Sequence, residues 1–273
     1  MRKLYARTLM IALAMTISAT SFASTVINGI YYNLNAKTLE AKVTYKTNSL
    51  TARNDYKGAV NIPATVTYEN KKYNVTAVSD SAFYFNTELT SITIPNSVKY
   101  VGIKAFMLCE NLTSATLPNS MTRIENSLFY CCGNLTSINI PEGVTVISEM
   151  AFNRCEKLSA VILPSTLKLI SPTSFLKCPS LKSVTAQASV PINMYENTFE
   201  TFGKLYVPEG SKEDYEKAVI WNNFTIIEST PTGISTISSN TDLTTQIYTL
   251  SGKKTQDPVK GVNIINGKKI IVR

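Results

Sequence analysis

Histidine is absent from all 273 residues of the chain. Its absence excludes Ser-His-Asp and Cys-His nucleophile pairs, histidine general bases and imidazole metal ligands. The chain also lacks a Cys-x-x-Cys pair, so its cysteines do not have the spacing of a zinc site. We therefore expect no catalytic residues, no cofactor and no bound metal.

Apolar runs long enough to span a bilayer are missing after residue 23. Residues 1–23 predict a secretory signal peptide, with three basic residues, a short apolar run over 9–17 and small residues around Phe22. The short run disfavours an uncleaved membrane anchor, and no cysteine follows to carry a lipid. Removing the leader leaves 24 basic residues against 19 acidic ones, a mild net charge of +5. We expect an exported protein without a transmembrane segment in its mature form.

The chain is dominated by a 23-residue repeat that is complete four times between Leu89 and Ser180. The copies read LTSITIPNSVKYVGIKAFMLCEN, LTSATLPNSMTRIENSLFYCCGN, LTSINIPEGVTVISEMAFNRCEK and LSAVILPSTLKLISPTSFLKCPS. A unit of this length cannot bury its own apolar face, so it must stack on its neighbours. The repeat therefore predicts a β-rich solenoid with little helix.

Each unit begins with a strand in which Ile92 and Ile94, or their counterparts, point inward, and a proline ends that strand. The alternating outward positions are the candidate partner-binding residues Ser91, Thr93, Ser114, Thr116, Ser137 and Asn139. A second extended piece around 98–101 adds Tyr100 and Arg123, at a position that varies between units. One phenylalanine per unit predicts a stacked aromatic core formed by Phe106, Phe129, Phe152 and Phe175.

Four cysteines, Cys109, Cys132, Cys155 and Cys178, occupy one repeat position. Export would permit disulfides between neighbouring turns, but side chains that all point the same way favour a ladder of buried thiols. Cys131 is outside this row, and the sequence leaves open whether it is an exposed, reactive thiol or half-buried. The oxidation state of the five cysteines is likewise left open.

Residues 24–74 predict an N-terminal β cap. It contains a hairpin that turns at Asn28-Gly29, a strand over 39–45 and a hairpin over 65–75. Its tyrosines are interpreted as packing residues. A half-unit starts at Val75, and we expect the hairpin to have replaced its first half. Asn86 stands where later units have cysteine.

The repeat decays after Leu181, with an insertion expected around 191–195 and a last turn at 205–208. Ser211 to Asp214 has the spacing of a capping box and predicts a helix to about Val219, followed by apolar residues around Trp221 that close the stack. The solenoid with this C-terminal cap then spans 75–228. A polar linker over 229–241 and a small β tail over 242–273 follow.

The pattern L-x-x-I-x-I-P…V-x-x-I…A-F-x-x-C resembles the bacterial leucine-rich repeats of BspA-like surface proteins. The resemblance implies a curved solenoid on a surface or secreted protein that adheres to host matrix proteins or other bacteria. The tail IYTLSGKK…KGVNIINGKKIIVR resembles the C-terminal sorting tails of Bacteroidetes type IX secretion. That second resemblance implies export to the outer side of a Gram-negative outer membrane.

Three functional hypotheses remain: an adhesion module for host matrix or bacterial surface macromolecules, a carbohydrate-active or peptidase enzyme or a carbohydrate-active enzyme accessory, and a structural spacer without a specific ligand. The acidic residues do not recur at one repeat position in every unit, which argues against a catalytic pair. The basic tail lacks interleaved aromatic residues, so we expect no nucleic-acid partner. The Ser/Thr row holds no aromatic anchors, which favours weak or multivalent binding. Oligomeric state is left open.

Overall fold

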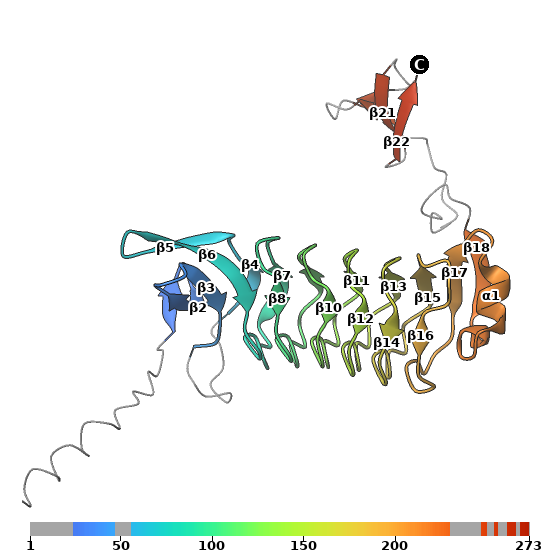
Figure 1. The fold of residues 1–273 in the computed structure, drawn as a ribbon, viewed down its shortest axis with the longest axis horizontal. Coiled ribbons are helices and arrows are strands. Elements are labelled where there is room, and N and C mark those ends of the chain that lie inside the picture. Colours follow the sequence, from blue (N-terminus) through green and yellow to red (C-terminus); the bar gives the residue numbers. More distant parts are fainter. Residues whose placement is uncertain are drawn as a thin grey trace, which may run out of the picture. The chain divides into compact units, whose positions relative to one another are not determined.

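The computed structural model describes residues 24–46 and 56–229, together with the backbone of four short strands between 247 and 272. The predicted signal peptide and residues 230–241 of the predicted linker lie outside the described residues. The chain divides into two compact units, residues 1–233 and 234–273. Figure 1 shows the first unit as a row of stacked turns with a curled sheet at its N-terminal end.

The N-terminal cap is a six-stranded sheet of order β1-β2-β3-β6-β5, with β8 (Tyr100–Val101) also paired to β6. Positive φ angles at Asn28 and Gly29 make the tight turn between the first two strands, as predicted. Strands β5 and β6 form the second predicted hairpin. The strands are β1 (Thr25–Ile27), β2 (Ile30–Asn35), β3 (Glu40–Val43), β5 (Thr65–Tyr68) and β6 (Lys71–Val78).

The expectation that a hairpin replaces the first half of the opening unit is wrong. Strand β4 (Gly58–Asn61) pairs in parallel with β7 (Leu89–Thr93), placing Val60 beside Ile92. Both residues are buried. The half-unit is therefore complete, and the β5–β6 hairpin is inserted between its two halves. Residues Val60 to Pro63 have the same apolar and proline pattern as Ile92 to Pro95. The inserted hairpin increases the number of residues between the two motifs beyond the repeat length.

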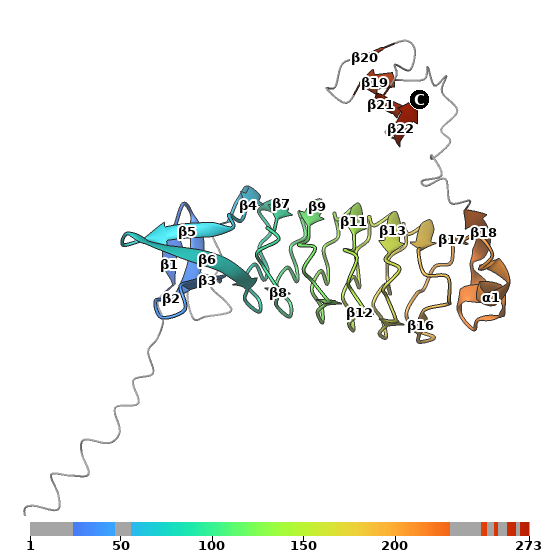
Figure 2. The same cartoon turned by 45° about the horizontal axis from the view of Figure 1, so that its top comes forward.

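The solenoid has two series of parallel strands, each aligned 23 residues apart over most of its length, for example Ser137 with Ala160 and Arg123 with Val146. Figure 2 shows the first series along one side of the stack. After β4 and β7 it contains β9 (Ser114–Thr116), β11 (Ser137–Asn139), β13 (Ala160–Leu163), β15 (Ser183–Ala186), β17 (Lys204–Pro208) and β18 (Thr225–Ser229). After β8 the second contains β10 (Arg123–Ile124), β12 (Val146–Ile147), β14 (Leu169–Ile170) and β16 (Asn193–Met194).

Tight turns close the remaining side of each unit, and they use left-handed backbone at two non-glycine positions. Lys104 and Leu108 have φ angles of 58° and 63°, and the corresponding residues of the other units behave alike. The turns bond to one another, since the Phe106 N–H donates to the Leu128 carbonyl at 3.0 Å. These backbone hydrogen bonds fix the spacing between consecutive turns of the solenoid.

The predicted phenylalanine stack is confirmed and is longer than expected. Ring centroids of Phe106 and Phe129 lie 5.3 Å apart, those of Phe129 and Phe152 5.5 Å, and those of Phe152 and Phe175 5.1 Å. Phe83 and Phe199 extend the stack at its two ends. Near-parallel rings at this spacing contribute aromatic packing beyond the area they bury.

The four cysteines in the repeated position are free and buried, which confirms the thiol ladder. Each Sγ donates to the carbonyl oxygen of the phenylalanine 26 residues earlier; for Cys155 and Phe129 the distance is 3.2 Å. Cys131 is half-buried and has a φ of 58°. The row is therefore built into the backbone hydrogen bonding of the turns.

The C-terminal cap consists of α1 (Lys212–Lys217) and the short 3-10 helix η1 (Trp221–Asn223). The predicted capping box is wrong, because the Ser211 side chain makes no capping hydrogen bond. The Glu228 carboxylate instead accepts from the N–H groups of Gly210 and Lys212 at 2.9 and 3.1 Å. Trp221 is buried and donates its indole N–H to the Ile192 carbonyl, which closes the stack as expected.

The second unit contains an antiparallel sheet of order β20-β19-β21-β22. Its strands are β19 (Ile247–Thr249), β20 (Lys254–Thr255), β21 (Gly261–Ile265) and β22 (Lys268–Val272). Predicted strands over 244–250 and 261–273 therefore correspond to observed ones. Within the part of the chain that the structure describes, no helix is long and apolar enough to cross a membrane.

Candidate partner-binding surface

The structure separates the eight candidate residues into two groups. Ser91, Thr93, Ser114, Thr116, Ser137 and Asn139 lie on the first strand series. Tyr100 and Arg123 lie on the second series, in β8 and β10. The two groups therefore belong to different faces of the stack, and only the first forms a continuous row.

The first row has side chains that are available for a partner. Thr93 pairs with Thr116 in register, and both side chains are exposed, whereas Ser91 is half-buried. None of the six side chains has a hydrogen-bond partner among the described residues. The neighbouring hydroxyl of Thr113 differs, because it donates to the Thr90 carbonyl at 2.9 Å. The structure thus distinguishes hydroxyls that hold the turns together from hydroxyls that face outward unpaired.

The outward row continues beyond the residues that the sequence pattern selected. Parallel pairing places Ile162 beside Asn139, then Thr185, and then Tyr206. Ile162 is 41% exposed, so the row gains a large apolar side chain in its C-terminal half. The echo of the first strand at Leu205, Val207 and Pro208 was the sequence signal that could have placed Tyr206 in this row.

An open cleft of about 540 Å³ lies at the C-terminal end of the same strand series. It combines two lysines, a partly exposed phenylalanine and several hydroxyls. The lining residues are Leu181, Lys182, Ser183, Thr201, Phe202, Gly203, Lys204 and Thr225. No sequence pattern pointed to this cleft, because it forms where the repeat shortens: Val184 aligns with Leu205, only 21 residues later.

Tyr100 and Arg123 are engaged in contacts within the fold. The Tyr100 hydroxyl donates to Asp80 Oδ1 at 2.9 Å, and burial together with this carboxylate raises the pKa of Tyr100 to about 12. Gly102 makes room for this contact, since a Cβ there would lie 2.4 Å from Asp80 Oδ1. Arg123 donates to Ser148 Oγ at 3.3 Å. These partners make the pair weaker candidates for recognition than the first row.

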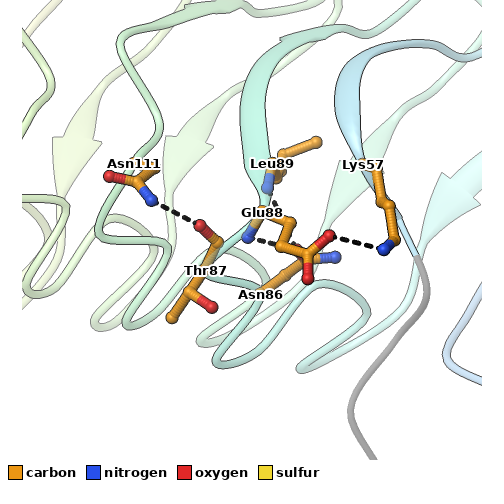
Figure 3. A network of polar contacts seen from close by, with 6 residues as sticks. All are labelled: Lys57, Asn86, Thr87, Glu88, Leu89 and Asn111. Atoms are coloured by element: carbon orange, nitrogen blue, oxygen red, sulfur yellow. Dashed lines mark hydrogen bonds and ion pairs between the residues drawn. The ribbon is translucent and has the colours of Figure 1, made fainter.

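A polar network at the N-terminal end of the thiol ladder has a structural role (Figure 3). Asn86 takes the repeated cysteine position, and its Oδ1 accepts from the N–H groups of Glu88 and Leu89, each at 3.1 Å. Lys57 forms an ion pair with Glu88 at 2.9 Å, and Asn111 donates to the Thr87 carbonyl at 2.7 Å. The network joins the turn that follows β6 to the strands on either side.

The acidic side chains do not present a catalytic arrangement. Glu110 and Glu156 share one repeat position but lie two units apart, and Glu125, Glu142 and Glu149 occupy three other positions. Burial raises the pKa of Glu125, and the nearby positive charge of Arg123 opposes that rise. Among residues 24–46 and 56–229, no three acidic or cysteine side chains converge in a way that could hold a metal ion.

Comparisons with known proteins agree with this architecture. Residues 76–205 match the BspA type leucine rich repeat region, in six copies. No curated protein sequence matches the chain. A leucine-rich repeat protein of T. pallidum is similar in structure, with 24% identity, a TM-score of 0.51, and coverage of 68% of this chain and 87% of that one.

Two further solved structures are similar over three quarters of this chain. A leucine-rich repeat protein from Bacteroides ovatus has 24% identity and a TM-score of 0.40, covering 75% of this chain and 67% of that one. A leucine rich cell surface protein from Faecalibacterium prausnitzii has 18% identity and a TM-score of 0.36, covering 76% and 72%. The strand register and the repeated sequence agree with the match of residues 76–205 to the BspA type leucine rich repeat region.

Proposed function

We propose that this protein is an exported surface or secreted adhesion module that binds host matrix proteins or bacterial surface macromolecules. The observation that carries the proposal is the row of unpaired outward side chains from Thr93 to Asn139 and on to Tyr206. Solenoids present long continuous faces of this kind, and such faces suit large partners.

The rigidity of the row supports binding rather than a spacer role. Its strands are paired in parallel within two sheets, β4-β7-β9 and β11-β13-β15-β17-β18, and the buried phenylalanine rings stack behind them at a regular spacing. Side chains held by a rigid scaffold lose little conformational entropy when a partner binds. The N-terminal half of the row lacks large anchors, so binding there would rely on many weak contacts.

The proposed location rests on the two ends of the chain. The leader at 1–23 supports export, and the resemblance of the tail to type IX sorting modules supports attachment outside the outer membrane. A binding role without catalysis is consistent with the scattered positions of the acidic side chains described above.

Capture of candidate partners tests the proposal. The protein and a Thr93→Arg, Thr116→Arg, Asn139→Arg variant would be immobilised and exposed to host matrix and bacterial surface extracts. We expect the variant to lose most of the captured material, because three long charged side chains would cover the row. A matched variant with Val146→Arg, Leu169→Arg and Asn193→Arg adds the same charge to the second strand series. Equal capture by all three proteins would rule out the first row as the binding face.

A further inference from the structure

We infer that the cleft around Lys182, Phe202 and Lys204 binds an acidic polysaccharide, with its carboxylate or sulfate groups at the lysines and a sugar ring on the phenylalanine. The inference rests on the proposed binding function and names a partner class for one end of the proposed face. Lys204 aligns with Ser183 and Thr225 in the outward row, so the cleft continues the surface that runs from Ser91.

Two unpaired cations line the cleft. Lys182 and Lys204 are exposed, and neither side chain has an ion pair among the described residues. Two acidic residues of the last turns accept backbone N–H groups, Glu200 from Lys177 and Glu228 from Gly210 and Lys212. Both lysines line the same cleft, so an anionic group bound there would meet two cations.

The backbone forces the two lysines onto adjacent turns at close range. The Lys204 N–H donates to the Lys182 carbonyl at 2.9 Å, and a Cβ on Gly203 would lie only 2.1 Å from the same oxygen. Only glycine therefore permits the two strands to approach in this way. The close approach of the two lysine backbones is therefore a property of the fold.

Phe202 supplies a fixed apolar surface beside the charges. Its side chain is 39% exposed, although most phenylalanines of the solenoid are fully buried. The ring is held edge-to-face against the buried Phe224, with centroids 5.1 Å apart and an interplanar angle of 84°. A held ring loses little entropy on binding, and its exposed face suits the C–H face of a sugar.

Hydroxyl groups complete the set of contacts that a saccharide needs. Ser183 and Thr225 have hydroxyls without a partner among the described residues, and Thr201 donates to the Cys178 carbonyl but keeps its lone pairs. An acidic peptide fits less well. Strands β15 and β17 are paired on both sides, so their backbone offers no free edge to an added strand.

Affinity measurements on the full chain with defined polymers test the inference. The probes are polygalacturonate, dextran sulfate, neutral dextran and polyglutamate. We expect binding to polygalacturonate or dextran sulfate but not to neutral dextran. Replacing two charged donors through Lys182→Gln and Lys204→Gln should weaken this binding about ten-fold or more. The control variant Lys99→Gln, Lys168→Gln removes two positive charges from exposed positions elsewhere. It should change the affinity for the acidic polysaccharides less than about two-fold.

The aromatic contact separates a saccharide from a general polyanion. Phe202→Leu keeps apolar packing against Phe224 but removes the flat ring, and it should weaken saccharide binding while leaving polyglutamate unchanged. Three results would overturn the inference. They are tighter binding of polyglutamate than of either acidic saccharide, a loss of saccharide affinity in the Lys99→Gln, Lys168→Gln control equal to that in the cleft variant, and no binding of either acidic saccharide. The proposed function would stand in each case if the Thr93, Thr116 and Asn139 variant still lost capture of extract proteins.

Discussion

The thiol of Cys132 donates a hydrogen bond to the carbonyl oxygen of Phe106, with 3.1 Å between the two atoms. The same bond joins Cys109 to Phe83 and Cys178 to Phe152. Each of these carbonyls also accepts a backbone N–H three residues further on, that of Cys109 for Phe106 at 3.1 Å, so the thiol adds a second hydrogen bond to a buried carbonyl of the preceding turn. Conservation of one residue type in this position of the repeat follows from that bond and does not require disulfide or metal chemistry.

The native protein should present one reactive thiol. Cys131 is half-buried, whereas the other four cysteines are buried and hydrogen-bonded. Titration with a thiol-reactive dye should therefore label Cys131 first and the others only after unfolding, because the thiolate is the reactive form. Cys131→Ser should abolish the first phase. Labelling of a second cysteine at the same rate would contradict the buried ladder.

Stability should fall at alkaline pH. Burial raises the pKa of Cys109 and of Cys178 from 9.0 to about 12. Below about pH 9 both thiols are protonated in the folded and unfolded states. Between about pH 9 and 12 the thiol ionises only in the unfolded state. Each of the two cysteines therefore lowers the free energy of unfolding by about 1.4 kcal/mol per pH unit. Urea unfolding under reducing conditions should show this slope, and Cys109→Ala should reduce it; an unchanged slope would refute the assignment.

Asn86 should be important for stability although it departs from the repeat. Asn86→Ala removes the acceptor of the buried Leu89 N–H and the partly buried Glu88 N–H, and we expect a loss of about 1–2 kcal/mol in the free energy of unfolding. Asn111→Ala, at an exposed position with one hydrogen bond, should cost about 0.5 kcal/mol. Chemical denaturation measures both losses. If the two variants lost the same free energy of unfolding, the network in Figure 3 would be only a surface feature.

Thr173 offers a stabilising substitution. It is a β-branched residue with a φ of 58°, and its hydroxyl is buried without a partner. Asparagine tolerates left-handed backbone better, so Thr173→Asn should add about 0.5–1 kcal/mol of stability. Thr122→Asn, at an exposed position without positive φ, should have little effect. A destabilised Thr173→Asn protein would show that the threonine methyl group contributes more packing than its backbone costs.

The C-terminal helix should depend on Glu228 rather than on Ser211. Glu228→Ala removes the carboxylate that accepts from Gly210 and Lys212, and we expect a loss of about 1 kcal/mol. Ser211→Ala should cost less, because the serine side chain makes no capping bond. Thermal melts of both variants would show which substitution lowers stability more. A larger loss in Ser211→Ala than in Glu228→Ala would support the capping box after all.

The sequence was sufficient for the solenoid, because packing residues such as Phe129 and Cys132 must recur when identical turns stack. It was insufficient where the period changes. Val60 was missed because the β5–β6 hairpin lengthens its distance to Ile92, and Glu228 acts on a helix that begins 16 residues earlier. The outward row was located by strand alternation, but Lys204 and Tyr206 joined it only through the shortened last turn.

The pairing of each strand with the next unit has a consequence for how the chain acquires its structure. Ser91 pairs with Ser114, and Ser137 with Ala160, so these strand pairs of the solenoid join residues one unit apart. Such a chain can add one turn at a time to a structured end, without waiting for distant segments. The N-terminal sheet is synthesised first, so it can serve as the template on which later turns fold.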